Sequence, residues 1–158
     1  MTQNTGRSVV SFFGLVVMTA VVGPAVAAEI AISNQGFEQL EPNGAVTGWR
    51  LVSEVSSETA TFAGEAEQAH NGVGSARLAV RGHGTVTAES DPVTLDVGKL
   101  YRLSGWIRTD GVVSDPLAKY PTAVPACLTL KTLPFTIHSP AVGGDSDWHR
   151  VDLPFIAT

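Results

Sequence analysis

The sequence predicts an all-β protein, and three observations lead to this prediction. First, short segments in which apolar and polar residues alternate recur between residues 29 and 157, as expected of half-buried strands. Second, these segments follow one another at intervals of about 8–12 residues and are separated by Gly and Pro turns, which is typical of sandwiches and barrels. Third, beyond residue 28 no segment longer than one turn has the helical period.

Residues 1–27 are predicted to be a secretory signal peptide in a helical conformation. A short polar start with one positive charge precedes an almost unbroken apolar run over residues 9–22, and Ala25-Val26-Ala27 matches a small-residue cleavage site. We expect cleavage after Ala27, with Ala28 as the second choice. The alternative is an uncleaved membrane anchor, although the run is shorter than the roughly 20 residues of a spanning helix. Secretion would place the mature domain, residues 28–158, outside the cell or in the periplasm.

The strands expected in the mature chain are bounded by turn residues. Phe37 follows an Asn-Gln-Gly turn and is expected in the core. A Ser-rich turn suggests that segments 49–55 and 58–63 are neighbours, and Pro154 within the last segment indicates an edge strand or a bulge. The full set of expected strands is 29–33, 49–55, 58–63, 75–81, 85–90, 93–97, 100–109, 124–131 and 148–157.

One stretch organises the predicted sheet. After a Gly98-Lys99 turn, residues 100–109 alternate strictly, which favours a central, half-buried strand. One face is expected to carry Tyr101, Leu103, Gly105 and Ile107. The opposite face is expected to carry Arg102, Ser104, Trp106 and Arg108. A tryptophan is thereby set among charged side chains.

Composition excludes some classes of function. The net charge is −5 and the Lys and Arg residues do not cluster, so nucleic-acid binding has no electrostatic basis. Cys127 is the only cysteine, which rules out an internal disulfide. It is expected to be a buried, inert thiol. The alternative, a nucleophile, lacks any recognisable signature of partner residues.

The sequence contains no recognisable catalytic constellation. No two carboxylates stand out as a facing pair of the kind that a glycosidase needs, and no Ser-His-Asp arrangement has a nucleophile-elbow motif. The four histidines lack metal-site spacing and are expected in turns or on the surface. Asp145-Ser146-Asp147 is compatible with a cation loop or with ordinary turn chemistry. We expect a non-catalytic chain.

Several short motifs, taken in their order, resemble those of a known family. They are Asn34-Gln35-Gly36-Phe37-Glu38, Gly48-Trp49, Gly72-Val73-Gly74-Ser75-Ala76-Arg77-Leu78, the stretch Gly98 to Arg108, Asp147-Trp148-His149-Arg150-Val151 and Phe155. This series resembles the carbohydrate-binding modules of families 4, 9 and 22, which have a galactose-binding-like jelly-roll β-sandwich. The resemblance covers essentially the whole mature chain.

The resemblance implies a non-catalytic module attached to a secreted hydrolase and often holding a structural Ca²⁺. Glu38 is the one calcium ligand that carries over from the family's pattern. The family's closing strand and its Asp-containing motif are absent. We therefore expect the module to be C-terminally incomplete and to belong to a longer parent protein, in which a catalytic domain follows Thr158.

A carbohydrate ligand is expected at the face that carries Trp106, Arg102 and Arg108, because aromatic rings stack on sugars while polar neighbours bond their hydroxyls. The alternative is that loop 110–125 covers Trp106 as part of the structure. At the level of function, a polysaccharide-binding module competes with two other interpretations. One is an accessory or docking domain of a secreted hydrolase, for example a peptidase, without glycan affinity. The other is a structural module at the cell surface.

Overall fold

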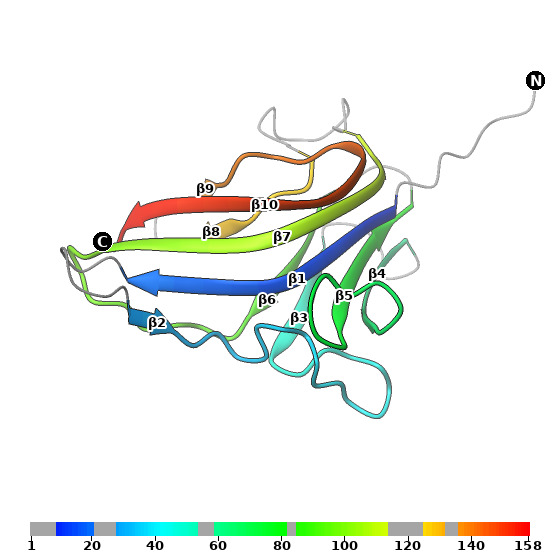
Figure 1. The fold of residues 1–158 in the computed structure, drawn as a ribbon, viewed down its shortest axis with the longest axis horizontal. Coiled ribbons are helices and arrows are strands. Elements are labelled where there is room, and N and C mark those ends of the chain that lie inside the picture. Colours follow the sequence, from blue (N-terminus) through cyan, green and yellow to red (C-terminus); the bar gives the residue numbers. More distant parts are fainter. Residues whose placement is uncertain (1–8, 21–27, 54–58, 82–84, 114–124, 132–135) are drawn as a thin grey trace, which may run out of the picture.

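Within the residues that the structure describes, the chain is all-β (Figure 1). The computed structural model describes residues 9–20, 28–53, 59–81, 85–113, 125–131 and 136–158, and these contain ten strands and no helix. The fold class predicted from alternation and turn spacing is therefore confirmed. In the described ranges there is likewise no helix long and apolar enough to cross a bilayer.

The largest sheet has six strands and is antiparallel throughout. Its order is β10-β7-β1-β5-β4, and the short strand β2 pairs with β1 outside this path. The bounds are β1 Val9–Ala20, β2 Ala28–Ile30, β4 Ala60–Glu65, β5 Ser75–Val80, β7 Leu100–Val112 and β10 Gly144–Ile156. Figure 1 shows β10, β7 and β1 running side by side along most of their length.

Two strand pairs complete the described structure. β3 (Trp49–Ser53) pairs with β6 (Val86–Ser90), and β8 (Thr129–Lys131) pairs with β9 (Thr136–His138). The expected pairing of segments 49–55 and 58–63 is wrong, because β4 pairs with β5 along its full length, from Ala60↔Val80 to Glu65↔Ser75. Those two strands form a local antiparallel hairpin, whose short connection costs little loop-closure entropy.

The helix expected over residues 1–27 is wrong where the structure describes it. Residues 9–20 form β1, whereas residues 1–8 and 21–27 lie outside the described ranges. The physical reason lies in the composition, because this apolar run is rich in Val and Phe, which fit a pleated surface well. An unbroken apolar run has no period that separates a buried strand from a helix. Signal-peptide cleavage itself stays a prediction.

The predicted central strand is confirmed, because β7 pairs with β10 on one side and with β1 on the other. Pro154 lies on β10, which ends the strand order, so its lack of an N–H is tolerated there as expected. The inner face of β7 contributes Tyr101, Leu103 and Ile107, which are 2%, 6% and 0% exposed.

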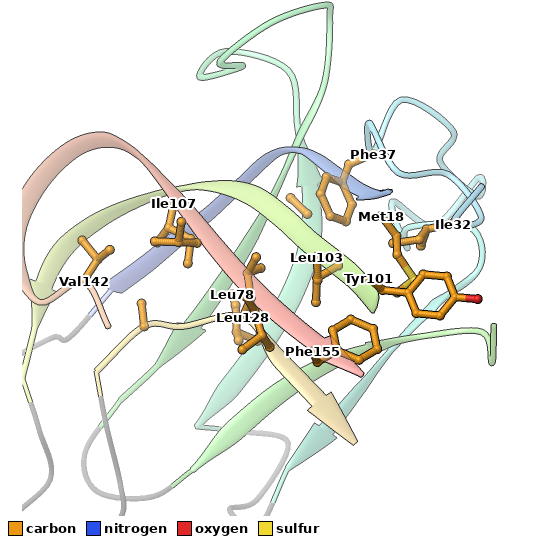
Figure 2. Packing of buried hydrophobic residues seen from close by; sticks show 14 of the residues in the cluster. Met18, Ile32, Phe37, Leu78, Tyr101, Leu103, Ile107, Leu128, Val142 and Phe155 are labelled. Atoms are coloured by element: carbon orange, nitrogen blue, oxygen red, sulfur yellow. The ribbon is translucent and has the colours of Figure 1, made fainter. Parts of the chain in front are cut away.

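The core lies against this face (Figure 2). Phe37 is 1% exposed, so its predicted core position is confirmed. The rings of Tyr101 and Phe155 stack with centroids 5.7 Å apart. Partly buried side chains of β3, β6 and β8 also pack against the cluster, among them Leu51, Val86 and Leu130. Apolar side chains from the main sheet and from the smaller strand pairs therefore share one core.

Candidate functional site

The outer row of β7 carries the residues predicted to bind a ligand. Along this row Arg102 is exposed, Ser104 is buried, and Trp106 and Arg108 are half-buried. The alternation of the strand is the cause, because every second side chain leaves the core. The face assignment made from the sequence is therefore confirmed.

Trp106 does not lie open on this face, because His70 stacks on it. The ring centroids are 3.9 Å apart and the planes are inclined by only 20°. Trp148, from β10, meets the same histidine edge-on, with centroids 5.6 Å apart. His70 comes from the segment between β4 and β5, so three separate parts of the chain build one aromatic cluster.

The sequence does not predict the contact of His70 with Trp106. Its patterns place the four histidines in turns or on the surface, and loop 110–125 is only the alternative that would cover Trp106. Residues 114–124 of that loop lie outside the described residues. The available signal was the break at 64–74, which follows β4 and must return the chain to β5. No local pattern, however, states over which strand such a connection lies.

A polar cleft of about 620 Å³ opens beside Arg108. Two arginines and three aspartates supply its charged groups, and their charges nearly balance. The complete lining is Gln68, Arg77, Arg108, Thr109, Asp110, Asp145, Ser146 and Asp147. Trp106 stands two residues before Arg108 on the same face of β7, about 7 Å away along the strand. The aromatic cluster and the polar cleft are thus adjacent.

Two polar atoms at this cleft are buried without a hydrogen-bond partner in the described structure, Arg77 Nε and Thr109 Oγ1. Thr109 is only 3% exposed. Neither Arg77 nor Arg108 forms an ion pair with any residue in the described ranges. Such atoms are uncommon, because buried polar groups are normally satisfied.

Two of the cleft's aspartates are held by backbone amides. Asp145 Oδ1 accepts a hydrogen bond of 2.6 Å from Gly111 N, which joins the ends of β7 and β10. Asp147 Oδ1 accepts one of 2.8 Å from Trp148 N. The turn expected for Asp145-Ser146-Asp147 is wrong, because these residues lie within β10; Asp145 bonds across to β7, and only Ser146 and Asp147 bond the neighbouring backbone. The two amide hydrogen bonds hold carboxylates that line the cleft.

Arg102 is separated from the other two predicted ligand residues. It lies four residues before Trp106, about 13 Å along the strand. Its Nε is 3.9 Å from Asp152 Oδ1, and the same oxygen accepts a hydrogen bond from Ser104 and one of 3.3 Å from Arg150. The Ser104 hydroxyl, more than the two guanidinium groups, holds the pKa of Asp152 below its ordinary value. Arg102 belongs to this charged network and does not line the cleft.

Glu38, the predicted calcium ligand, lies beneath a turn. Its Oε1 accepts a hydrogen bond of 3.3 Å from Val73 N, in the segment just before β5. Two glycines allow this close approach. Gly72 has a φ of +74°, and a Cβ on Gly74 would lie 2.8 Å from the Phe37 carbonyl oxygen. In the described ranges no three or more His, Cys, Asp or Glu side chains gather closely enough to hold a metal ion.

Cys127 contacts two polar side chains near β8 and β9. Its Sγ is 3.8 Å from both Thr129 Oγ1 and His138 Nδ1. Burial nevertheless raises the pKa of the Cys127 thiol, which keeps it protonated and weakly nucleophilic. A histidine neighbour that the sequence did not reveal is present, but the environment does not activate the thiol.

The comparisons with known proteins identified no relative of this chain. No protein-family model matches this chain, and searches of curated proteins and of solved structures return no significant match. The carbohydrate-binding resemblance drawn from the short motifs thus stays a prediction, and the function has to be inferred from the residues of the site.

Proposed function

We propose that this chain is an exported, non-catalytic module of galactose-binding-like jelly-roll type that binds carbohydrate at the Trp106–Arg108 face. The observation that carries the proposal is the adjacency of the aromatic cluster and the polar cleft on one face of β7 and β10. Sugars present apolar faces and many hydroxyls, and so need both surfaces together.

The charge balance of the cleft supports a neutral glycan rather than a polyanion. Arg77 and Arg108 supply directional N–H donors, while the three aspartates supply acceptors. Hydroxyl groups donate and accept, so one sugar can engage both kinds of partner. Arg77 Nε, a donor, and Thr109 Oγ1, a hydroxyl oxygen, have no hydrogen-bond partner in the described structure. Arg102 is left out of this binding surface because it pairs with Asp152.

The experiment is binding of the full chain to a panel of insoluble polysaccharides and to a glycan array. We expect Trp106→Ala to lose binding because the stacking surface is removed. Arg108→Ala should lose binding at least tenfold, since a hydrogen bond to a charged group contributes about 1.5–3 kcal/mol. Arg102→Ala is the matched control, an arginine of the same strand and face that lies outside the cleft, and it should bind as wild type. Absence of binding to every glycan would overturn the proposal and favour the docking-domain alternative.

We also propose that Glu38 contributes to a structural Ca²⁺ site. A cation there requires about six to eight oxygen ligands, and in the described structure no group of three or more His, Cys, Asp or Glu side chains includes Glu38. Backbone carbonyls of the same turn, such as that of Phe37, would have to supply others. The test is the Tm of the full chain with Ca²⁺ and with EDTA. Wild type should melt higher with Ca²⁺, and Glu38→Gln should abolish the difference. An equal Tm in wild type would contradict the site.

A further inference from the structure

β1 occupies an interior position in the main sheet. Against β7 its register runs from Val9↔Asp110 to Ala20↔Tyr101. Against β5 it runs from Val9↔Ala79 to Phe12↔Ala76. Figure 1 shows β1 between these two neighbours. One edge of β1 pairs with β7, and the other edge pairs with β5 over residues 9–12 and with β2 over residues 18–20.

The same residues carry the predicted export signal. The sequence of β1, VVSFFGLVVMTA, contains no charged residue and no proline. Cleavage after Ala27 would remove the whole strand from the mature domain. The inference below depends on the export and signal cleavage in the proposed function, because one segment cannot be both a removed signal peptide and a permanent strand of the domain.

Removal of β1 would leave a defined gap. β5 and β7 would face each other across two strand spacings, about 9–10 Å, which is too far for direct hydrogen bonds. Their backbone groups along the gap would lose their partners, at a cost for each group that stays buried. Met18, which is 3% exposed and lies opposite Leu103 in the register with β7, would also leave the core. Two unpaired edges that line an apolar gap form a template for another strand.

We propose that the slot between β5 and β7 is a strand-acceptor groove that, once residues 1–27 are removed, takes up an apolar strand of a partner polypeptide. β1 itself defines the ligand chemistry: an extended, uncharged, proline-free segment of about twelve residues, antiparallel to β7 along residues 9–20 and to β5 along residues 9–12. A second copy is the weaker occupant. In the described ranges its long strands, β7 and β10, are already paired, and β2 has only three residues.

The groove is tested with the full chain carrying a protease site in place of residues 21–27. Cleavage of the folded protein leaves β1 held by non-covalent contacts alone. A fluorescent peptide with the sequence of residues 9–20, flanked by lysines for solubility, is then added in excess. We expect it to displace the resident segment and to co-elute with the protein. A matched peptide with Phe12→Pro and Val17→Pro should bind at least tenfold less, because proline lacks the N–H that the ladder requires.

Three results would overturn the groove. The cut segment could leave while no peptide enters. It could also resist exchange even after unfolding and refolding with excess peptide. A cut chain that dimerises instead of taking up peptide would show that a second copy is the occupant.

The mass of the exported chain is measured separately. A secreted chain that still begins at Met1 would contradict the proposed signal-peptide cleavage. A cleaved chain that takes up no peptide would contradict only the strand-acceptor groove.

Discussion

His70 stacks on Trp106 with ring centroids 3.9 Å apart, and this contact links the segment between β4 and β5 to the central strand. It covers one face of the tryptophan that the sequence predicts to be a ligand contact. A ligand at this site therefore meets an aromatic cluster, not an isolated ring. Because of this contact, replacing His70 tests how far the ring of Trp106 is shielded from solvent.

Replacing His70 should expose Trp106. We expect His70→Ala to shift the tryptophan emission to longer wavelength and to lower stability by about 0.5–1.5 kcal/mol, the usual range for an aromatic pair. The measurement is fluorescence and chemical unfolding of the full chain. The spectral shift should be smaller in a Trp106→Phe background, where only Trp148 still contacts His70. His149→Ala, at an exposed histidine of β10, serves as the control. An unshifted spectrum in the single variant would argue against the stacking.

Arg77 should matter for binding more than for folding. Its Nε is buried without a partner, so Arg77→Met removes an unmet donor and keeps most of the side-chain volume. We expect stability to change by less than about 1 kcal/mol, while glycan affinity falls roughly tenfold through the loss of a hydrogen bond to a charged group. Denaturant titration and glycan binding measure the two effects. A large loss of stability with unchanged affinity would assign Arg77 to the structure alone.

The sequence predicted the faces of β7 well, because burial of one face forces a period of two on the chain. Tyr101 and Ile107 are buried, and Trp106 and Arg108 lie on the opposite side. Periodicity gives the face, but not which loops lie over it. The separation of Arg102 from the cleft depends on Asp152, fifty residues away in sequence, and no local pattern reports such a neighbour.

The segment 9–20 shows a second limit of sequence patterns. Its apolar run predicts export by comparison with signal sequences, and it also suits a buried strand, because both environments select the same residues. The pairing of β1 with β5 and β7 depends on edges that the rest of the chain supplies. Long-range pairing of this kind is invisible in the run itself. The same holds for β6, the partner strand of β3.

Asp152 should make stability depend on pH. The pKa of its carboxyl is lowered in the folded state, chiefly by the hydrogen bond from Ser104. This contribution is therefore fully present above the ordinary carboxyl pKa of about 3.9 and is lost as the pH falls through the folded value. We expect the Tm difference between wild type and Asp152→Asn to be largest near neutral pH and to shrink on acidification. Ser104→Ala should narrow the same difference, and a gap that is constant with pH would contradict this account.

The contact between residues 36–38 and the turn before β5 should tolerate an added methyl group at Gly36 and not at Gly74. A Cβ on Gly74 would lie 2.8 Å from the Phe37 carbonyl oxygen, and backbone atoms cannot easily move away. Gly74→Ala should therefore lower the free energy of unfolding by about 1–3 kcal/mol, the usual cost of overpacking. The measurement is denaturant unfolding of the full chain. Gly36→Ala is the matched control, because its nearest contact would be Glu38 Cγ at an ordinary 3.6 Å. It should be neutral or stabilising by up to about 1 kcal/mol, because alanine restricts the unfolded chain. Equal effects of the two substitutions would show that the approach of residues 37–38 to the turn before β5 is not as close as described.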